Sequence, residues 1–144
     1  MRIVIVGDLQ FKRGESINDI ARDISELSPD YTILLGDYGY WECFGSYEVF
    51  SEVSKAFKMA GVKKLIPLIG NHDVQNEAGE RLVKSGFVWE NFKKAFGYYP
   101  ENKVLEFDDF RVFCINIEPQ KKDSFYFEYE CFVSDSSFEN ICRE

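Results

Sequence analysis

Three short apolar runs, each followed at once by glycine and a polar residue, constrain the fold of this chain more than any other feature. The runs are "RIVIV" (2–6), "YTILL" (31–35) and "KLIPLI" (64–69), and the loops after them begin "GDLQ", "GDYG" and "GNHD". The runs are rich in β-branched residues and too short for helices. Near-continuous apolar runs are typical of strands covered on both faces in a parallel sheet. The sequence therefore predicts a parallel sheet whose strands all end in polar loops.

Amphipathic segments lie between these runs, as the crossovers of a parallel sheet require. The first begins near Ser16, which has Asp19 three residues further on in capping-box spacing. Its predicted apolar stripe is Ile17, Ile20, Ala21, Ile24 and Leu27. A second helix is expected from Ser46 to Gly61, since serine favours the N-cap and glycine follows the C-terminus. A weaker third helix is predicted over about 80–96.

The last predicted elements form a hairpin. The segments "KVLEF" (103–107) and "FRVFCINI" (110–117) flank an Asp108-Asp109 turn. Within the third apolar run, Pro67 lacks an N–H and therefore indicates an edge strand or a bulge. The element order is β-α-β-α-β-α-β-β, which is typical of the α/β class. The length favours a single domain over residues 1–144.

Composition narrows the classes of function. The formal net charge is −8 and the pI about 4.8, which disfavours non-specific binding to nucleic acid or anionic lipid unless bound cations offset the charge. The longest apolar runs have about five residues, so no membrane span is expected. Met1 leads directly into a strand-like run rather than a secretory signal. Four cysteines without CxxC or zinc-type spacing indicate reduced thiols and a cytoplasmic location.

The polar loops are expected to meet. Consecutive parallel strands joined by right-handed crossovers share one carboxyl edge, where open α/β sheets bind ligands. Asp8, Asp37, Asn71 and His72 should therefore lie in one pocket. The two carboxylates would repel each other unless a divalent cation joined them, and oxygen ligands suit Mg²⁺ or Mn²⁺. An adjacent imidazole suits metal-assisted hydrolysis. Taken singly, each Gly-Asp is common turn chemistry, and the histidine could be incidental.

The three motifs, at 7–10, 36–39 and 70–73, resemble those of the calcineurin-like metallophosphoesterase superfamily in order and spacing. The family pattern is Asp-x-His, then Gly-Asp, then Gly-Asn-His-Asp/Glu, each after a strand. The resemblance extends from Met1 to about residue 117. It implies a β-sandwich of two sheets flanked by helices, of which this chain would form the N-terminal half.

The resemblance also implies a two-metal site. By position in the motifs, Asp8 would bind the first metal, Asp37 would bridge both metals, and Asn71 would bind the second through its amide oxygen. His72 would be the general acid near the leaving group. Asp73 would orient and polarise its imidazole.

Two departures from the family pattern affect this expectation. Gln10 stands where the family usually has histidine, so a site built on its amide oxygen should be weaker and favour Mg²⁺ or Mn²⁺ over Zn²⁺. A simple loop role for Gln10 is the alternative. The only histidine is His72, so the two later histidine segments of the family have no counterpart. Ser136 and Glu139 have capping-box spacing close to the C-terminus, which suggests a C-terminally truncated domain.

Residues beside the motifs are candidates for substrate binding. Lys12 and Arg13 could contact phosphate, or could be a solvated basic pair. Tyr38, Tyr40 and Trp41 could stack on a base, which would favour nucleotide or nucleic-acid substrates. The alternative is that these aromatic rings pack the loop against the next helix. Half of a sandwich would leave an apolar sheet face uncovered, which predicts a homo-oligomer or a partner chain.

The sequence thus predicts a metal-dependent phosphoester hydrolase, a phosphatase or phosphodiesterase, or the N-terminal part of one. The alternative is a catalytically degenerate module of the same fold that acts as a protein-interaction scaffold. Gln10 and the missing histidines favour the scaffold, whereas the retained acidic cluster and His72 favour the enzyme. A dinucleotide-binding domain is disfavoured because "VGDLQFKRG" lacks the GxGxxG spacing.

Overall fold

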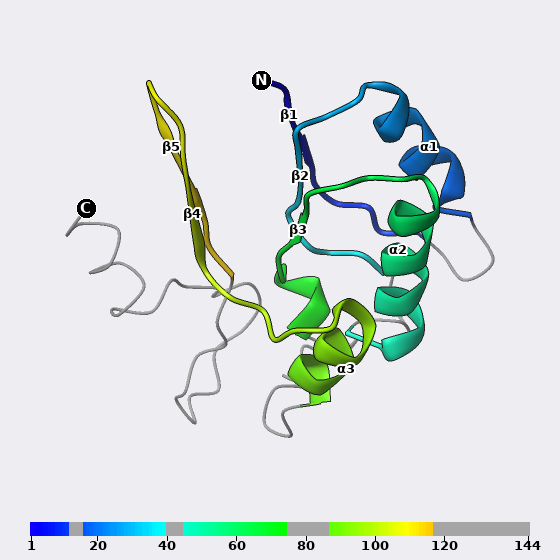
Figure 1. Cartoon of the computed structure of the whole chain (residues 1–144). Helices are drawn as coiled ribbons and strands as arrows, with labels where there is room; N and C mark the ends of the chain where they lie inside the picture. The colour runs from blue at the N-terminus through cyan, green and yellow to red at the C-terminus, as the bar shows by residue number, and fades with distance from the viewer. Residues whose placement is uncertain (12–15, 40–44, 75–86, 117–144) are drawn as a thin grey trace.

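The computed structural model of the chain describes residues 1–11, 16–39, 45–74 and 87–116. Its elements in chain order are β1 (Ile3–Val6), α1 (Asn18–Glu26), β2 (Tyr31–Leu34), α2 (Tyr47–Met59), β3 (Leu65–Pro67), the short 3-10 helix η2 (His72–Val74), α3 (Phe87–Phe96), β4 (Lys103–Glu106) and β5 (Arg111–Cys114). The predicted α/β order is confirmed. Figure 1 shows the β4–β5 hairpin, the β1–β3 sheet and the helices as successive layers.

The central sheet is parallel and has the order β1-β2-β3. Val4 pairs with Thr32, and Ile33 pairs with Ile66, so the three strands point the same way. Strand β3 lies at an end of this order, and Pro67 is its last residue. Among the described strands, β3 therefore has the edge position, one of the two alternatives predicted from the proline. All three strands deliver their following loops to one edge of the sheet (Figure 1).

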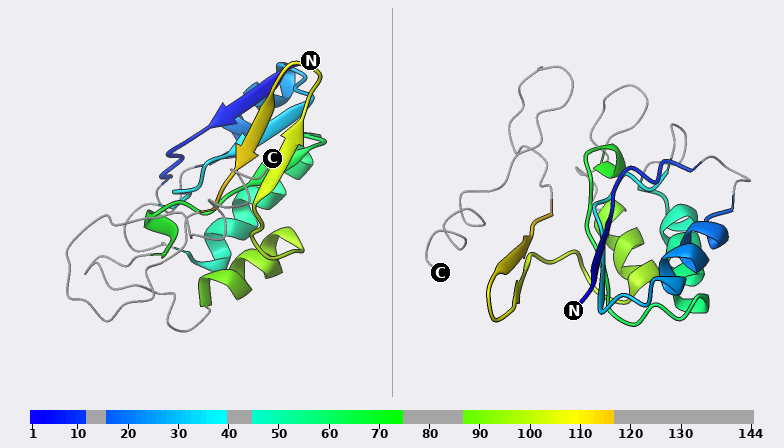
Figure 2. Two further views of the ribbon diagram at one scale, coloured as in Figure 1. Left: turned by 90° about the vertical axis from the view of Figure 1, so that its left-hand side faces the viewer. Right: turned by 90° about the horizontal axis from the view of Figure 1, so that it is seen from above.

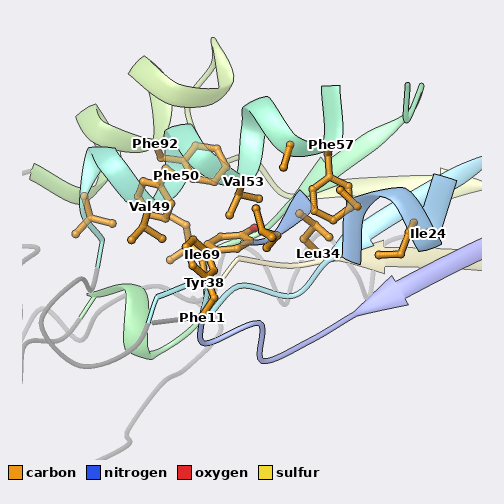
Figure 3. Close-up of a cluster of buried hydrophobic side chains, with 14 of the residues drawn as sticks. Phe11, Ile24, Leu34, Tyr38, Val49, Phe50, Val53, Phe57, Ile69 and Phe92 are labelled. Atoms are coloured by element: carbon orange, nitrogen blue, oxygen red, sulfur yellow. The ribbon is translucent and has the colours of Figure 1, made fainter. Parts of the chain in front are cut away.

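The three helices cover one face of this sheet and build the main core with it (Figures 1 and 2). Phe50 of α2 and Phe92 of α3 meet edge to face, with ring centroids 5.6 Å apart. Figure 3 shows these rings in one cluster with Leu34 and Ile69, which come from the sheet side. Rings in this geometry gain about 0.5–1.5 kcal/mol beyond the area that they bury. The aromatic content of the chain therefore anchors α2 and α3 to the sheet.

Helix α2 begins and ends where the sequence predicts. The Ser46 hydroxyl accepts the Val49 N–H at 3.3 Å. Beyond the other end, Gly61 takes a positive φ of 78°, and the Val62 N–H donates to the Phe57 carbonyl at 3.1 Å. This is the hydrogen-bond pattern of a Schellman cap, which glycine permits without steric strain. The local signals in the sequence were thus sufficient to define this helix.

Helix α1 differs in part from its prediction. The Ser16 hydroxyl accepts the N–H of Asn18, the first helical residue, rather than that of Asp19. Ile20 and Leu27, assigned to the apolar stripe, are 39% and 49% exposed. At 100° per residue they lie roughly 70–90° around the helix from the centre of the buried stripe. The stripe is therefore narrower than predicted.

The hairpin forms as predicted and covers part of the other sheet face. β4 and β5 are antiparallel, with the Phe107 N–H donating to the Phe110 carbonyl across the Asp108-Asp109 turn. Its apolar side chains pack against Ile33 and Ile66 in a second, smaller core. Figure 2 shows the hairpin on the side of the sheet away from the helices.

The cover over this second face is incomplete. Ile5 and Leu35 follow Ile3 and Ile33 by two residues, which places them on the same face of their strands. They are 58% and 48% exposed. The structure therefore leaves an apolar part of this face open along β1, in the region where the sequence predicts an uncovered surface.

Some predictions lie outside the described residues. These are the start of the third helix at 80–86, the capping pair Ser136 and Glu139, and three of the four cysteines. The fourth, Cys114, is a buried free thiol. Within the described ranges, none of the helices has the length and apolarity that a membrane span would need.

A buried hydroxyl in the centre of the sheet gives a stability prediction. The Thr32 side chain is fully buried, and its Oγ1 has no hydrogen-bond partner among the residues that the structure describes. Burying such a group costs about 1–3 kcal/mol. Replacing Thr32 with valine keeps the branched shape, so Thr32→Val should raise the free energy of unfolding in urea by about 1 kcal/mol or more. The control Thr32→Ser keeps the hydroxyl and should be less stable than wild type; a destabilised valine variant would contradict the account.

Candidate active site

The loops after β1 and β2 continue side by side beyond the sheet. The Gln10 N–H donates to the Asp37 carbonyl at 2.9 Å, and the Phe11 N–H donates to the Tyr38 carbonyl at 3.1 Å. A parallel bridge then joins Phe11 to Gly39. These contacts fix the two Gly-Asp loops against each other. They bring Asp8 and Asp37 to the same edge of the sheet, although the two residues are far apart in the sequence.

The backbone at this edge is strained at its polar residues. Asp8, Gln10 and Asp37 have positive φ angles of 49°, 33° and 52°. Side-chain-bearing residues rarely adopt this left-handed region, and each such position costs on the order of 1–3 kcal/mol. In the described part of the chain, only Ser28 among the other non-glycine residues shares this conformation. The strain is therefore concentrated in the two acidic loops.

Asp37 is at the centre of the cluster. Its Oδ1 accepts the His72 N–H at 2.8 Å, which ties the second loop to the third. Burial raises the pKa of the Asp37 carboxyl, and the neighbouring Asp8 carboxyl raises it further, while His72 lowers it. The Asp8 carboxylate is thus close enough to oppose the ionisation of Asp37. A cation between them would remove that conflict.

Two glycines allow the second and third loops to approach this closely. A Cβ on Gly70 would lie 2.2 Å from the Asp37 Oδ1, and one on Gly36 would lie 2.0 Å from the Gly70 backbone nitrogen. Both positions would clash with atoms that cannot move freely. Gly36 also has a φ of 95°, which favours glycine. The glycines of the second and third motifs are therefore required by the packing of one loop on the other.

The Asp73 carboxylate holds the same two loops together from inside. It is fully buried. Its Oδ2 accepts the N–H groups of Asp37 and Gly70 at 2.8 and 2.9 Å, and its Oδ1 accepts the Tyr38 N–H at 3.1 Å. Burial raises the pKa of the Asp73 carboxyl to about 7, although these backbone donors lower it. This residue joins backbone segments, and its expected role in orienting the His72 imidazole stays a prediction.

The remaining predicted ligands lie at the same edge. The Gln10 Nε2 donates to the Asp8 Oδ1 at 3.3 Å, so the nitrogen of this amide is the atom directed at the carboxylate. Asn71 is half-buried, and its backbone carbonyl accepts the Val74 N–H at 3.3 Å. Neither amide oxygen has a hydrogen bond among those described for the site. Gln10 therefore supports the carboxylate, and its role as a metal ligand stays a prediction.

The donor set fits a hard divalent cation better than zinc. Over the described ranges, no group of three or more histidine, cysteine, aspartate or glutamate side chains is arranged to hold a metal. The oxygen donors available are the carboxylates of Asp8 and Asp37 and the amides of Gln10 and Asn71. Oxygen sets of this kind suit Mg²⁺ or Mn²⁺, which also retain water ligands. The Asp8 and Asp37 carboxyls are the charged groups that would hold such an ion.

Tyr38 lies in the core. Its side chain is fully buried, its hydroxyl donates to the Leu68 carbonyl at 2.7 Å, and its ring packs against Phe50 and Phe96. This is the core packing that was the alternative to stacking on a substrate, and Figure 3 shows the ring among the buried side chains. The other candidate substrate contacts, Lys12, Arg13, Tyr40 and Trp41, lie outside the described residues.

One residue beside the site was missed by the sequence reasoning. The Asn116 side chain follows β5 and accepts the backbone N–H of Ile69, directly before the Gly-Asn-His-Asp motif, at 2.9 Å. A lone asparagine after a strand carries no local signal for such a contact. A hint was available in β3, whose outer edge needs acceptors for its N–H groups because it is an end strand.

The fold and this edge define a class: an α/β protein with an acidic, histidine-bearing cluster at the carboxyl ends of parallel strands. Residues 1–141 match the calcineurin-like phosphoesterase family, and the chain belongs to that family. The resemblance recognised in the three motifs is thereby confirmed, together with the fold. No curated protein has a significantly similar sequence.

The buried carboxyls predict how stability depends on pH in the metal-free protein. The pKa of Asp73 is raised from 3.8 to about 7 in the folded protein, so the folded chain keeps this proton more firmly than the unfolded chain. The resulting stabilisation is complete below the unfolded pKa and is lost progressively as the pH rises to about 7. Asp37 is shifted in the same direction. Each pKa unit is equivalent to about 1.4 kcal/mol. Urea unfolding with a chelator present should therefore give a free energy of unfolding about 2–3 kcal/mol lower at pH 8 than at pH 5, mainly through Asp73.

The matched variant for this measurement is Asp73→Asn, which cannot titrate at that position. Its free energy of unfolding should change less between pH 5 and pH 8 than that of wild type. The exposed Asp19→Asn variant removes the same charge elsewhere and should keep the wild-type slope. Equal slopes in wild type and Asp73→Asn would show that the buried carboxyl does not govern the pH dependence.

Proposed function

We propose that this chain is a divalent-metal-dependent phosphoester hydrolase whose site is the edge formed by the three motifs. The observation that carries the proposal is the pairing of the Asp8 and Asp37 carboxyls beside His72. Asp8, Asp37 and Asn71 would hold the metal, and Gln10 would support Asp8. When bound, the metal would polarise the phosphoryl group and activate a water.

His72 is the proposed general acid. Its backbone N–H is fixed to the Asp37 Oδ1, and its imidazole is close enough to lower the pKa of Asp37. A protonated imidazole held there can donate its proton to the leaving oxygen of a phosphoester. Asp73 supports this step by fixing the backbone on both sides of Asp37 and at Gly70.

The finer features of the activity also belong to the proposal. The oxygen-rich donor set supports Mn²⁺ or Mg²⁺. Both phosphate monoesters and diesters, including nucleotides and nucleic acids, fit the proposed chemistry. Lys12 and Arg13 would contact phosphate, and Tyr40 and Trp41 would contact a base. We place the protein in the cytoplasm, in keeping with the free thiol of Cys114.

Loss of the bridging carboxylate is the direct test. Wild type should hydrolyse an aryl phosphate monoester or diester in the presence of Mn²⁺. Asp37→Asn should lower the rate on the order of 100-fold or more, because a neutral amide cannot supply the charge that holds the metal. Calorimetry should show the same loss in Mn²⁺ affinity. The control Asp19→Asn removes an exposed charge on α1 and should keep both properties.

The competing function is a scaffold of the same fold that binds another protein without catalysis. Two observations favour it: Gln10 directs a nitrogen at Asp8, and the described residues hold no cluster of three strong metal ligands. If the wild-type chain shows neither hydrolysis nor Mn²⁺ binding, the enzyme proposal is overturned and the scaffold function is left. Hydrolysis that survives in Asp37→Asn would place the chemistry elsewhere.

We also propose that the open part of the second sheet face is a self-association surface. The exposed Ile5 and Leu35 support this, since adjacent apolar side chains on a sheet favour contact with a second apolar surface. Sedimentation of wild type should give a mass above the 16.8 kDa of one chain. Ile5→Thr keeps the β-branched shape and should shift the distribution towards monomer, whereas Met59→Thr, at an exposed position on α2, should not.

A further inference from the structure

Asn116 links the hairpin to the third loop of the site. It follows β5, and its side chain is 7% exposed. Its Oδ1 accepts the N–H of Ile69 at 2.9 Å. Ile69 is itself buried and is followed directly by Gly70, the first residue of the Gly-Asn-His-Asp motif. An amide from the far side of the sheet is therefore bonded to the backbone that carries the proposed ligand and acid.

The geometry of an end strand explains why this bond is needed. Successive N–H groups of a strand point to opposite sides. The Leu68 N–H points inward and donates to the Leu34 carbonyl at 2.8 Å, so the Ile69 N–H points outward, where the described residues supply no further strand. A buried N–H without an acceptor costs about 1–3 kcal/mol. The Asn116 carboxamide supplies that acceptor.

Asn116 is held in turn by Asn102, which lies just before β4. The Asn116 backbone N–H donates to the Asn102 Oδ1 at 2.7 Å, and its side-chain Nδ2 lies 3.5 Å from the same oxygen. These contacts join the two ends of the hairpin. The bonded path therefore runs from Asn102 through Asn116 to Ile69, and it reaches the site from a layer that contains none of the three motifs.

The third loop has little freedom to absorb a shift of Ile69. The Gly70 N–H donates to the Asp73 Oδ2 at 2.9 Å, and the His72 N–H donates to the Asp37 Oδ1 at 2.8 Å. Gly70 already lies against the Asp37 carboxylate, where even a Cβ would not fit. A displacement at Ile69 would therefore move the loop relative to Asp37. Asn71 and His72 would move with it.

We propose that Asn116 is a positioning residue, which sets the place of Asn71 and His72 relative to Asp37, and that Asn102 fixes Asn116. The consequence for catalysis rests on the proposed hydrolase function. The positional role itself does not, because it follows from the hydrogen bonds of the metal-free protein. The two ideas can therefore fail separately.

The chain offers a clean probe, because His72 is its only histidine. Asn116→Leu removes the acceptor at similar size and should shift the imidazole resonances of His72 in the metal-free protein. Asn116→Asp keeps an acceptor oxygen and should restore them at least in part. In the same variants, the Mn²⁺ affinity should fall about 10-fold or more for leucine and recover with aspartate. Ser25→Ala, which removes a side-chain bond to the Ala60 carbonyl between α1 and α2, is the control.

The outcomes separate positioning from general destabilisation. A folded Asn116→Leu protein with wild-type His72 resonances would overturn the proposal, as would an equal change in Ser25→Ala. If Asn116→Leu does not fold, Asn102→Ala replaces it: this exposed residue holds Asn116, so its loss should move the same resonances, and unchanged resonances would again overturn the proposal. A wild-type protein that binds no Mn²⁺ would remove the hydrolase function, and the imidazole resonances would still decide the positional role.

Discussion

The site depends on the hydrogen bonds that the buried side chain of Asp73 accepts. This side chain accepts backbone N–H groups from Asp37, Tyr38 and Gly70, and so it joins the loop after β2 to the loop after β3. Without this acceptor, several buried donors would be unpaired. The left-handed backbone at Asp37 is maintained because the surrounding contacts over-determine it.

The same construction places unfavourable charge at one edge of the sheet. Asp8, Asp37 and Asp73 are brought close together, and burial raises the pKa of the two that are enclosed. This arrangement is unfavourable for stability, since burial opposes the ionisation of Asp37 and Asp73. A divalent cation bound between Asp8 and Asp37 would remove the repulsion between their carboxylates. Membership of the calcineurin-like phosphoesterase family is consistent with that use of the edge.

Much of the framework was predictable because its signals are local. Short β-branched runs gave the parallel strands, Ser46 and Gly61 defined α2, and Pro67 gave an end strand. The misses concern side chains whose environment is set by distant segments. Ile20 and Leu27 follow the helical period of the apolar stripe of α1, but they lie outside the part of the helix that contacts the core. Tyr38 is an aromatic residue in a motif loop, where it could contact a ligand, yet side chains of α2 and α3 enclose it.

The sequence by itself determined the order of elements, the family and the edge at which the polar motifs meet. It did so because strand direction follows from connectivity and because each motif directly follows its strand. Only the tertiary structure decided that Asp73 binds backbone, that Gln10 supports Asp8, and that Asn116 reaches Ile69 from the hairpin. The contacts of Asp73 with Asp37 and of Asn116 with Ile69 join residues far apart in the chain. Their hydrogen-bond partners exist only once the layers have packed.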